Sequence, residues 1–283
     1  MPLQTPLHVL LSIRQLYRPL QPAWRQAGEG VVYREQLPAA PLRTFVHCYW
    51  ELRTEAPLDA PYTYPVVADG CIDLLFPLED PSQTFVMGFC DRCTAVPLGN
   101  VFHYAGIRFF PAIFPALAGI DAQELSGRFE PLEAVAQALA ACLEQQLAQT
   151  SSLQADRFEA IAAKFDQGLL SYLASRPSPA VDPRFAAALH LILQRRGVLQ
   201  VQTELDTGLS PRQLRRYFER YVGGTAKAFS QVVRFQHVLH AQPLTQTLRK
   251  DPVFFDLGYY DQAHFIKEFK QFYGATPGAV FGR

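Results

Sequence analysis

The side chains best suited to chemistry lie in two short runs near the carboxyl end of the chain, LSPRQLRRYFERY and GYYDQAHFIKEFKQFY. Both runs combine arginine or lysine with glutamine. Arginine can donate two hydrogen bonds to guanine in the DNA major groove, and glutamine can bond adenine in a similar way. These residue types therefore predict contact with double-stranded DNA. The candidates are Arg212, Gln213, Arg215 and Arg216 in the first run, and Gln262, Ala263, His264, Lys267 and Lys270 in the second.

Each run has the features of a helix that follows a tight turn. Gly208 and Gly258 can adopt the left-handed backbone that ends one helix before a sharp turn. Ser210 and Asp261 are short acceptors of the kind that cap the next helix. Apolar side chains then recur at helical spacing, which predicts a buried stripe and leaves the basic residues outside it. The stripe positions are Leu214, Tyr217, Phe218 and Tyr221 in the first run and Phe265, Phe269 and Phe272 in the second.

The two runs repeat with their capping residues 51 positions apart. Residues 226–241 between them contain no glycine and are predicted to form a stiff helix. Asp182 followed by Pro183 is a typical helix start, with the carboxylate as cap and proline at the first helical position. The sequence therefore predicts an all-α domain with two helix-turn-helix units joined by a linker helix. Two such units could enter successive major grooves on one face of the duplex.

The charge of the chain is divided unevenly, although its formal net charge is zero. Residues 195–283 hold 13 Lys and Arg against 7 Asp and Glu, a net charge of +6. Residues 1–194 hold 13 Lys and Arg against 19 Asp and Glu, a net charge of −6. A basic segment suits a polyanion, because cations placed on phosphates release condensed counterions.

The run GYYDQAHFIKEFKQFYGATP, together with Gly208 to Gly224, resembles the DNA-binding domain of the AraC/XylS family of transcriptional regulators, over residues 183–281. The resemblance implies that Arg212, Arg215, Arg216, Gln262, Ala263 and Lys267 contact bases. The chain departs from the family pattern in the supporting helices. Glu204 and Phe254 occupy positions that are usually alanine, and Pro252 stands where the second supporting helix should begin. We expect such side chains to separate or rotate the two helices of each unit.

The first half of the chain has a different pattern. Residues 31–110 are rich in Val, Tyr, Phe and Thr between Pro and Gly, which predicts a mainly β (α+β) domain, with a strand, a turn at Asp69-Gly70 and a further strand. Helical patterns follow at 131–149 and 157–173, and the first of these is our candidate for a dimer surface. The stretches HCYWELR, YPVVADGCIDLLF, VMGF and AGIRFFPAIFPALAGIDAQEL resemble the amino-terminal domain of a poorly characterised AraC-type subgroup, which implies a sensor or dimerisation domain.

Several polar and aromatic residues of this half could line a ligand pocket, which typically combines aromatic walls with a few polar groups. The candidates are Trp50, Tyr62, Tyr64, Asp73 and Arg108, with Glu51 and Asp69 as further members. The alternative is structural: Asp69-Gly70 is a hairpin turn, and Arg108 pairs with Asp73.

Cys90 and Cys93 have a spacing that suits zinc or redox chemistry, but no second pair follows them, so two ordinary cysteines are favoured. Further zinc ligands such as His47, Cys48, Cys71 and His103 would have to be brought together by the fold.

The remaining features restrict the class of protein. No motif of a nucleotide-binding loop, serine hydrolase or zinc protease occurs, so we predict neither an enzyme nor a cofactor. We see no signal peptide or membrane span, and five cysteines suit a reducing cytoplasm. We therefore predict a cytoplasmic two-domain regulator, with a sensor or dimerisation domain at 1–176 and a DNA-binding domain at 177–283. Its expected partners are DNA, RNA polymerase, a small effector and a second copy. The alternatives are a DNA-addressed cysteine or metal sensor and a degenerate regulator that binds protein.

Overall fold

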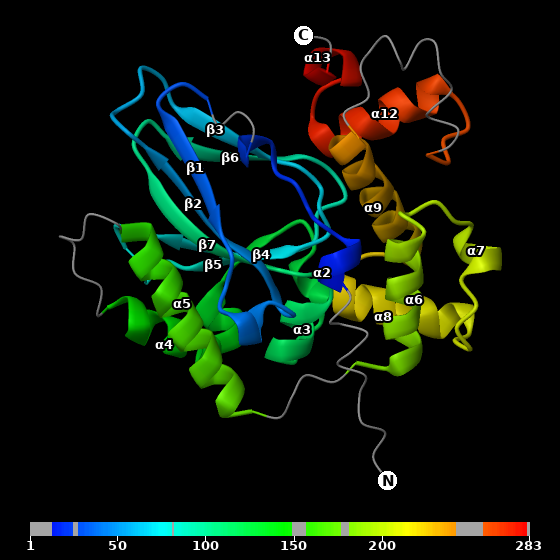
Figure 1. Cartoon of the computed structure of the whole chain (residues 1–283), viewed down its shortest axis with the longest axis horizontal. Helices are drawn as coiled ribbons and strands as arrows, with labels where there is room; N and C mark the ends of the chain where they lie inside the picture. Colours follow the sequence, from blue (N-terminus) through cyan, green and yellow to red (C-terminus); the bar gives the residue numbers. More distant parts are fainter. Residues whose placement is uncertain are drawn as a thin grey trace.

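The computed structural model describes residues 13–24, 28–80, 82–148, 157–176, 181–241 and 257–281 (Figure 1). The first part of the chain is mostly β and the last part is helical, as the sequence predicts. The strands are β1 (Val31–Gln36), β2 (Val46–Thr54), β3 (Tyr62–Val66), β4 (Ile72–Pro77), β5 (Phe85–Met87), β6 (Thr94–Gly99), β7 (His103–Phe109) and β8 (Phe129–Pro131). The helices of this part are α2 (Ile13–Leu16), η1 (Pro22–Trp24), η2 (Ala40–Leu42), α3 (Ile113–Ala118), η3 (Ala122–Leu125), α4 (Leu132–Leu147) and α5 (Arg157–Ala174).

Two sheets form the amino-terminal domain. The larger one has the order β1-β2-β7-β4-β5-β8, and the smaller one pairs β3 with β6. All pairs are antiparallel, with Trp50 opposite Gly106 and Asp73 opposite Arg108. A small hydrophobic cluster, which includes Trp50 and Tyr64, lies where the sheets approach each other. Gly106 makes room for this cluster, since a Cβ there would lie 2.2 Å from the indole of Trp50.

The strands on either side of Asp69-Gly70 do not form a hairpin, contrary to the structural alternative stated above. β3 pairs with β6 in the small sheet, whereas β4 pairs with β5 and β7 in the large sheet. Residues 67–71 therefore cross from one sheet to the other. Gly70 has a φ of +70°, which a glycine accommodates without strain. The sequence pattern identified both strands but not their partners.

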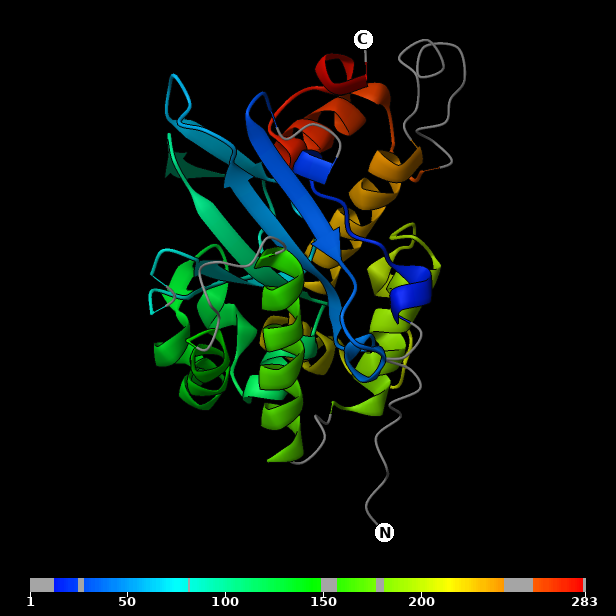
Figure 2. The same cartoon turned by 60° about the vertical axis from the view of Figure 1, so that its left-hand side comes forward.

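Helices α4 and α5 lie side by side along the outer face of the large sheet (Figures 1 and 2). Phe165 of α5 packs on Tyr49 of β2 and Phe76 of β4, with ring centroids 5.3 and 4.8 Å apart. The apolar face of α4 is covered by its own chain, since Leu139 and Leu143 are fully buried. This corrects the proposal that the helix predicted at 131–149 supplies a dimer surface: its stripe belongs to the core of one chain.

The carboxyl-terminal domain consists of helices throughout its described residues: α6 (Pro183–Gln194), α7 (Val201–Glu204), α8 (Pro211–Val222), α9 (Ala226–Ala241), α12 (Gln262–Tyr273) and α13 (Pro277–Phe281). Asp182 caps α6 through a hydrogen bond from the Arg184 amide. Gly208 and Gly258 both have a positive φ, of +74° and +75°, as the predicted turns require. The first helix-turn-helix unit is formed by α7 and α8. Residues 242–256, where the supporting helix of the second unit was predicted and which include Pro252 and Phe254, lie outside the described residues.

One hydrophobic cluster runs through both domains. It includes Phe109 and Phe165 of the amino-terminal domain together with Phe185, Phe229 and Phe272 of the helical domain. Linker helix α9 runs beside the sheets from α8 to α12, with α6 on its other side (Figures 1 and 2). Ten of its sixteen residues are buried, among them Phe229, Phe235 and Gln236. The two-domain organisation predicted from the sequence therefore comes with a close contact between the domains.

Candidate DNA interface and ligand pocket

Helix α8 buries one face and exposes basic residues on the other. Leu214 and Phe218 are buried, whereas Arg212, Arg215 and Arg216 are exposed. Arg215 donates to Glu219 at 2.7 Å, one turn further along the helix, and the Arg216 guanidinium lies 5.5 Å from the centre of the Tyr217 ring. The exposed side of α8 is therefore densely cationic near its amino-terminal end.

Gln213, a candidate for contact with DNA, also caps the start of α8 together with Ser210. The Ser210 hydroxyl oxygen accepts from the Gln213 amide at 3.3 Å, and the Ser210 amide donates to the Gln213 side-chain oxygen at 3.0 Å. This reciprocal pair is a capping box, which satisfies two backbone donors at the helix start. The Gln213 side chain is thus held at the end of α8, so that base contact would require it to leave the cap.

Helix α12 has the same division of faces. Phe265, Phe269 and Phe272 are buried, as predicted. Asp261 caps the helix by accepting from the His264 amide at 2.7 Å. The candidates on this helix, Gln262, Ala263, His264, Lys267 and Lys270, are all exposed.

A buried ion pair that the sequence analysis did not identify fixes α12 against α9. The Nη2 atom of Arg234 donates to both carboxylate oxygens of Glu268 at 2.7 Å, and its Nη1 atom donates to the Gly258 carbonyl at 3.1 Å. The guanidinium also lies 4.2 Å from the centre of the Tyr259 ring. Gln231 adds a bond of 2.9 Å to Glu268. A charged pair within two otherwise apolar helix faces was the available signal in the sequence.

Glu204, one of the two departures in the supporting helices, is exposed and turned back on its own helix. Its carboxylate accepts from the Gln200 amide at the start of α7. The α-helical part of this supporting segment is only four residues long. In the first unit the Glu204 side chain therefore lies at the surface of a very short helix. Phe254, the second departure, lies outside the described residues.

The amino-terminal domain touches both candidate recognition helices at their carboxyl ends. At the end of α8, the Ser126 hydroxyl donates to the Gly223 carbonyl, and a Cβ at Gly223 would meet the Ala122 carbonyl at 2.9 Å. At the end of α12, the Cys93 amide donates to the Gln271 carbonyl at 2.9 Å, and the Gln271 side chain donates to the Asp91 carbonyl at 2.8 Å. Cys93 of the CxxC pair thus contributes a backbone contact to this interface.

The crossing segment 67–71 makes a third contact, with the linker helix and with α12. The Ala68 carbonyl accepts from the Gln236 side chain on α9 at 2.8 Å, and the Ala68 amide donates to the Phe272 carbonyl on α12 at 3.2 Å. Gly70 lies against Phe229 of α9, where a Cβ would approach to 2.9 Å. These five residues therefore join the sheets to two helices of the other domain.

The amino-terminal domain contains a pocket between its two sheets, with a volume of about 460 Å³ including its open mouth. Four of the five predicted ligand residues line it: Trp50, Tyr64, Asp73 and Arg108. Tyr62 does not, because its ring stacks on Phe102 at a centroid distance of 5.5 Å. The lining residues that the sequence analysis missed are Tyr33, Leu52, Val66, Leu75, Met87, Val96, Leu98 and Tyr104.

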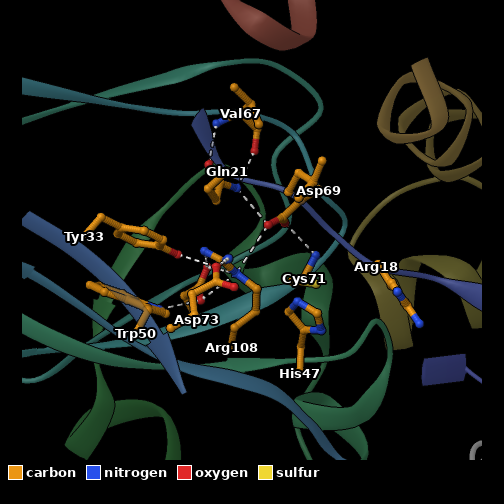
Figure 3. Close-up of polar contacts among 12 residues, drawn as sticks. Arg18, Gln21, Tyr33, His47, Trp50, Val67, Asp69, Cys71, Asp73 and Arg108 are labelled. Carbon is orange, nitrogen blue, oxygen red and sulfur yellow. Dashed lines mark hydrogen bonds and ion pairs between the residues drawn. The ribbon is translucent and has the colours of Figure 1, made fainter. Parts of the chain in front are cut away.

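The polar residues of this pocket form one buried network (Figure 3). Arg108 faces Asp73 at 3.1 Å, Asp69 at 3.4 Å and Glu35 at 3.6 Å. Asp73 also accepts from the Trp50 indole at 3.0 Å. Burial raises the pKa of Asp73 to about 6, against the opposing effect of the Arg108 charge. Asp73 and Arg108 therefore form the ion pair of the structural alternative, and both also line the pocket.

Asp69 connects this network to the crossing segment. Its Oδ2 atom accepts from the Gln21 side chain at 2.8 Å, and its Oδ1 atom accepts from the Cys71 amide at 2.9 Å (Figure 3). Its carbonyl accepts from the Tyr17 hydroxyl at 2.6 Å. Glu51 belongs to a different set of contacts, with Arg34 and His103. It is therefore not part of the pocket.

One group of residues that could hold a metal ion lies close together, and it does not include Cys90 or Cys93. Ligand atoms of Glu35, His47 and Cys48 lie within 4.8 Å of one another, beside a β-bulge between Val46 and Cys48. Burial lowers the pKa of His47 to about 3, so the imidazole is neutral. However, the Arg108 guanidinium lies 3.6 Å from Glu35 and opposes a bound cation. The prediction of no metal site is therefore kept.

Comparison with known families supports the division of the chain. Residues 206–283 match the family described as a helix-turn-helix domain, of the AraC type. Residues 34–131 match a domain of unknown function, DUF6597. No curated protein matches the sequence. Among solved structures, the crystal structure of ToxT from Vibrio cholerae O395 is similar, with 10% identity over 89% of this chain and 96% of that chain. Its TM-score of 0.32 is too low to establish a shared fold.

Among the described residues, no helix has both the length and the apolar character needed to cross a membrane.

Proposed function

We propose that this chain, whose carboxyl-terminal region is an AraC-type helix-turn-helix domain, is a transcriptional regulator that binds operator DNA through α8 and α12. The observation that carries the proposal is the matching exposure of cations on the two helices. Arg212, Arg215 and Arg216 on α8, and Lys267 and Lys270 on α12, are exposed outside buried apolar stripes. Cations at such positions can bond phosphates and guanine.

The experiment compares wild-type protein with the double variant Arg216→Ala, Lys267→Ala on fragments of its own upstream region, over a series of salt concentrations. We expect selective binding by the wild type that weakens steeply with salt. The double variant should bind more weakly and with a smaller salt slope, reduced by about one for each phosphate contact removed.

The matched control is Arg128→Ala, Lys164→Ala, which removes the same two charges from the amino-terminal domain. We expect it to bind DNA like the wild type. If both double variants lost the same amount of DNA affinity, the loss would come from overall charge, which would contradict a specific role for α8 and α12. A wild-type protein without selective binding would contradict the operator function.

We further propose that the amino-terminal domain controls DNA binding by changing how α8 and α12 are held. Its contacts with Gly223, with Gln271 and with Gln236 reach both recognition helices and the linker helix between them. Asp69 belongs to the polar network of the pocket and also to the segment that contacts α9 and α12. A molecule that shifts Arg108 would therefore act on this segment directly.

The other expected partners follow from this function. A regulator bound at a promoter would work in the cytoplasm and would meet RNA polymerase there. A homodimer would need a surface other than the apolar stripe of α4, which is packed within the chain. Gel filtration of the purified protein, with and without DNA, tests the dimer.

A further inference from the structure

The pocket between the two sheets contains two polar atoms that have no hydrogen-bond partner among the described residues. These are the hydroxyl of Tyr64 and the Nη1 atom of Arg108, which lies 3.6 Å from the Glu35 carboxylate, within ion-pair distance but beyond hydrogen-bond distance. Both side chains are buried, with 9% and 3% of their surfaces exposed, and both line the pocket. A buried donor left without a partner is costly, and structures rarely keep one without a reason. Two of them facing the same pocket point to a bound molecule.

The rest of the pocket determines what kind of molecule this is. Its walls are aromatic and aliphatic, with the rings of Tyr33, Trp50 and Tyr104 beside that of Tyr64. The carboxylate of Asp73 is already engaged by the Trp50 indole and by the Arg108 guanidinium. The groups without a hydrogen bond are a guanidinium N–H and a phenol, so the occupant must offer an acceptor.

The charges near Arg108 select among possible acceptors. Three carboxyl groups, from Asp73, Asp69 and Glu35, lie within 3.6 Å of its nitrogen atoms. An anionic ligand would bring a further negative charge into this group, which Coulomb repulsion disfavours in a buried site. A cationic ammonium group has no lone pair with which to accept from the Nη1 atom of Arg108. An uncharged ligand meets neither penalty.

We propose that the pocket binds an uncharged, single-ring aromatic molecule whose carbonyl or hydroxyl oxygen accepts from Arg108 Nη1 and bonds the Tyr64 hydroxyl. The ring lies among the aromatic walls, and the oxygen supplies the hydrogen bond that both buried groups lack. This inference names the class of effector through which the amino-terminal domain would control DNA binding. Its role in regulation rests on that proposed function. Binding itself is independent of DNA.

Three probes of similar shape test the proposal: acetophenone, ethylbenzene and benzoate. The readout is the indole N–H signal of Trp50 in a proton–nitrogen correlation spectrum, since this group donates to Asp73 at the pocket. The chain has two tryptophans, and a Trp24→Phe variant assigns the signal of Trp50. We expect acetophenone to shift this signal saturably. Ethylbenzene, which lacks the acceptor, should bind about ten-fold more weakly or not at all, and benzoate should bind more weakly than acetophenone.

The variant Tyr64→Phe keeps the ring and removes only the hydroxyl. We expect it to weaken acetophenone binding about five-fold or more while leaving ethylbenzene unchanged. Tyr62→Phe is the matched control, because Tyr62 lies on the same strand but does not line the pocket, and its affinity for acetophenone should stay within two-fold of the wild type.

Four results would overturn the proposal: no shift of the Trp50 signal with acetophenone, equal binding of ethylbenzene, tighter binding of benzoate, or unchanged affinity in Tyr64→Phe. None of these measurements contains DNA. A protein that binds acetophenone but no operator would therefore contradict the regulator function alone, and a protein that binds its operator but not acetophenone would contradict the ligand class alone.

Discussion

Removal of the Arg234 guanidinium should destabilise the helical domain strongly and loosen α12. In the variant Arg234→Met the Glu268 carboxylate, 5% exposed, would remain buried without its bidentate partner. Leaving one member of a buried ion pair costs about 3–5 kcal/mol of unfolding free energy. The bond from Gln231 to Glu268 remains, which favours the lower half of that range. The Gly258 carbonyl would also lose its bond from Arg234.

Urea unfolding followed by far-ultraviolet circular dichroism measures this loss, provided that the slope with urea stays constant. The second variant is Arg234→Met, Glu268→Gln, which removes the stranded charge. We expect it to recover most of the lost stability, because replacing both members of a buried pair is often close to neutral. The single variant should also lose affinity for operator DNA, since Arg234 fixes the position of α12.

Arg215→Met is the control for stability. This residue also pairs with a glutamate, but its own side chain is exposed at the surface of α8, where an ion pair stabilises a protein little. We expect no clear change in its urea midpoint. A loss below about 1 kcal/mol in Arg234→Met, or a double variant no more stable than the single one, would show that the reasoning about the buried pair is wrong.

Three further changes test other parts of the structure. Tyr64→Phe should raise the unfolding free energy of the ligand-free protein by about 1 kcal/mol, because it removes a buried hydroxyl without a partner; a lower urea midpoint would contradict this. Burial holds the pKa of His47 at about 3, below its ordinary value of 6.5. The unfolded chain therefore binds more protons between these pH values, and stability falls as the pH drops. His47→Gln should reduce this slope by up to about 1.4 kcal/mol per pH unit, and an unchanged slope in urea unfolding between pH 4 and 6 would contradict the prediction. Ser210→Ala removes the cap of α8 and should cost about 1 kcal/mol in thermal unfolding; an unchanged melting temperature would exclude a stabilising capping box.

The features that the sequence predicted correctly depend on neighbouring residues. Ser210 and Asp261 cap helices because their side chains reach an amide three positions away. Gly208 and Gly258 lie in the turns because glycine adopts a positive φ without strain. The buried and exposed positions of α12 follow from the period of a single helix. Such signals are contained within about ten residues, so no knowledge of the tertiary structure is needed to find them.

The features that the sequence did not predict depend on distant residues. The crossing at Asp69-Gly70 resembles a hairpin locally, and only the pairing of β3 with β6 shows otherwise. Tyr62 and Tyr64 lie two positions apart on one strand, yet only Tyr64 lines the pocket, and the register of the β3–β6 pair shifts between Tyr62 and Thr63. The pair of Arg234 with Glu268 joins residues 34 positions apart. No local pattern distinguishes these residues from others of the same type.

The shared core limits the way in which the amino-terminal domain can act on DNA binding. Phe229, Phe235 and Phe272 are fully or almost fully buried in the hydrophobic cluster that spans both domains. Separating the domains would expose the side of Phe229 that faces Gly70, together with other apolar surface at the contact, and burial of one phenylalanine side chain stabilises a protein by about 1.5–3 kcal/mol. An effector the size of a single ring would have to offset this cost through its difference in affinity for the two states, which limits any ligand-driven change of state. Control through small shifts of the segment 67–71 against α9 and α12 requires no such exposure, and it leaves the linker helix buried in both states.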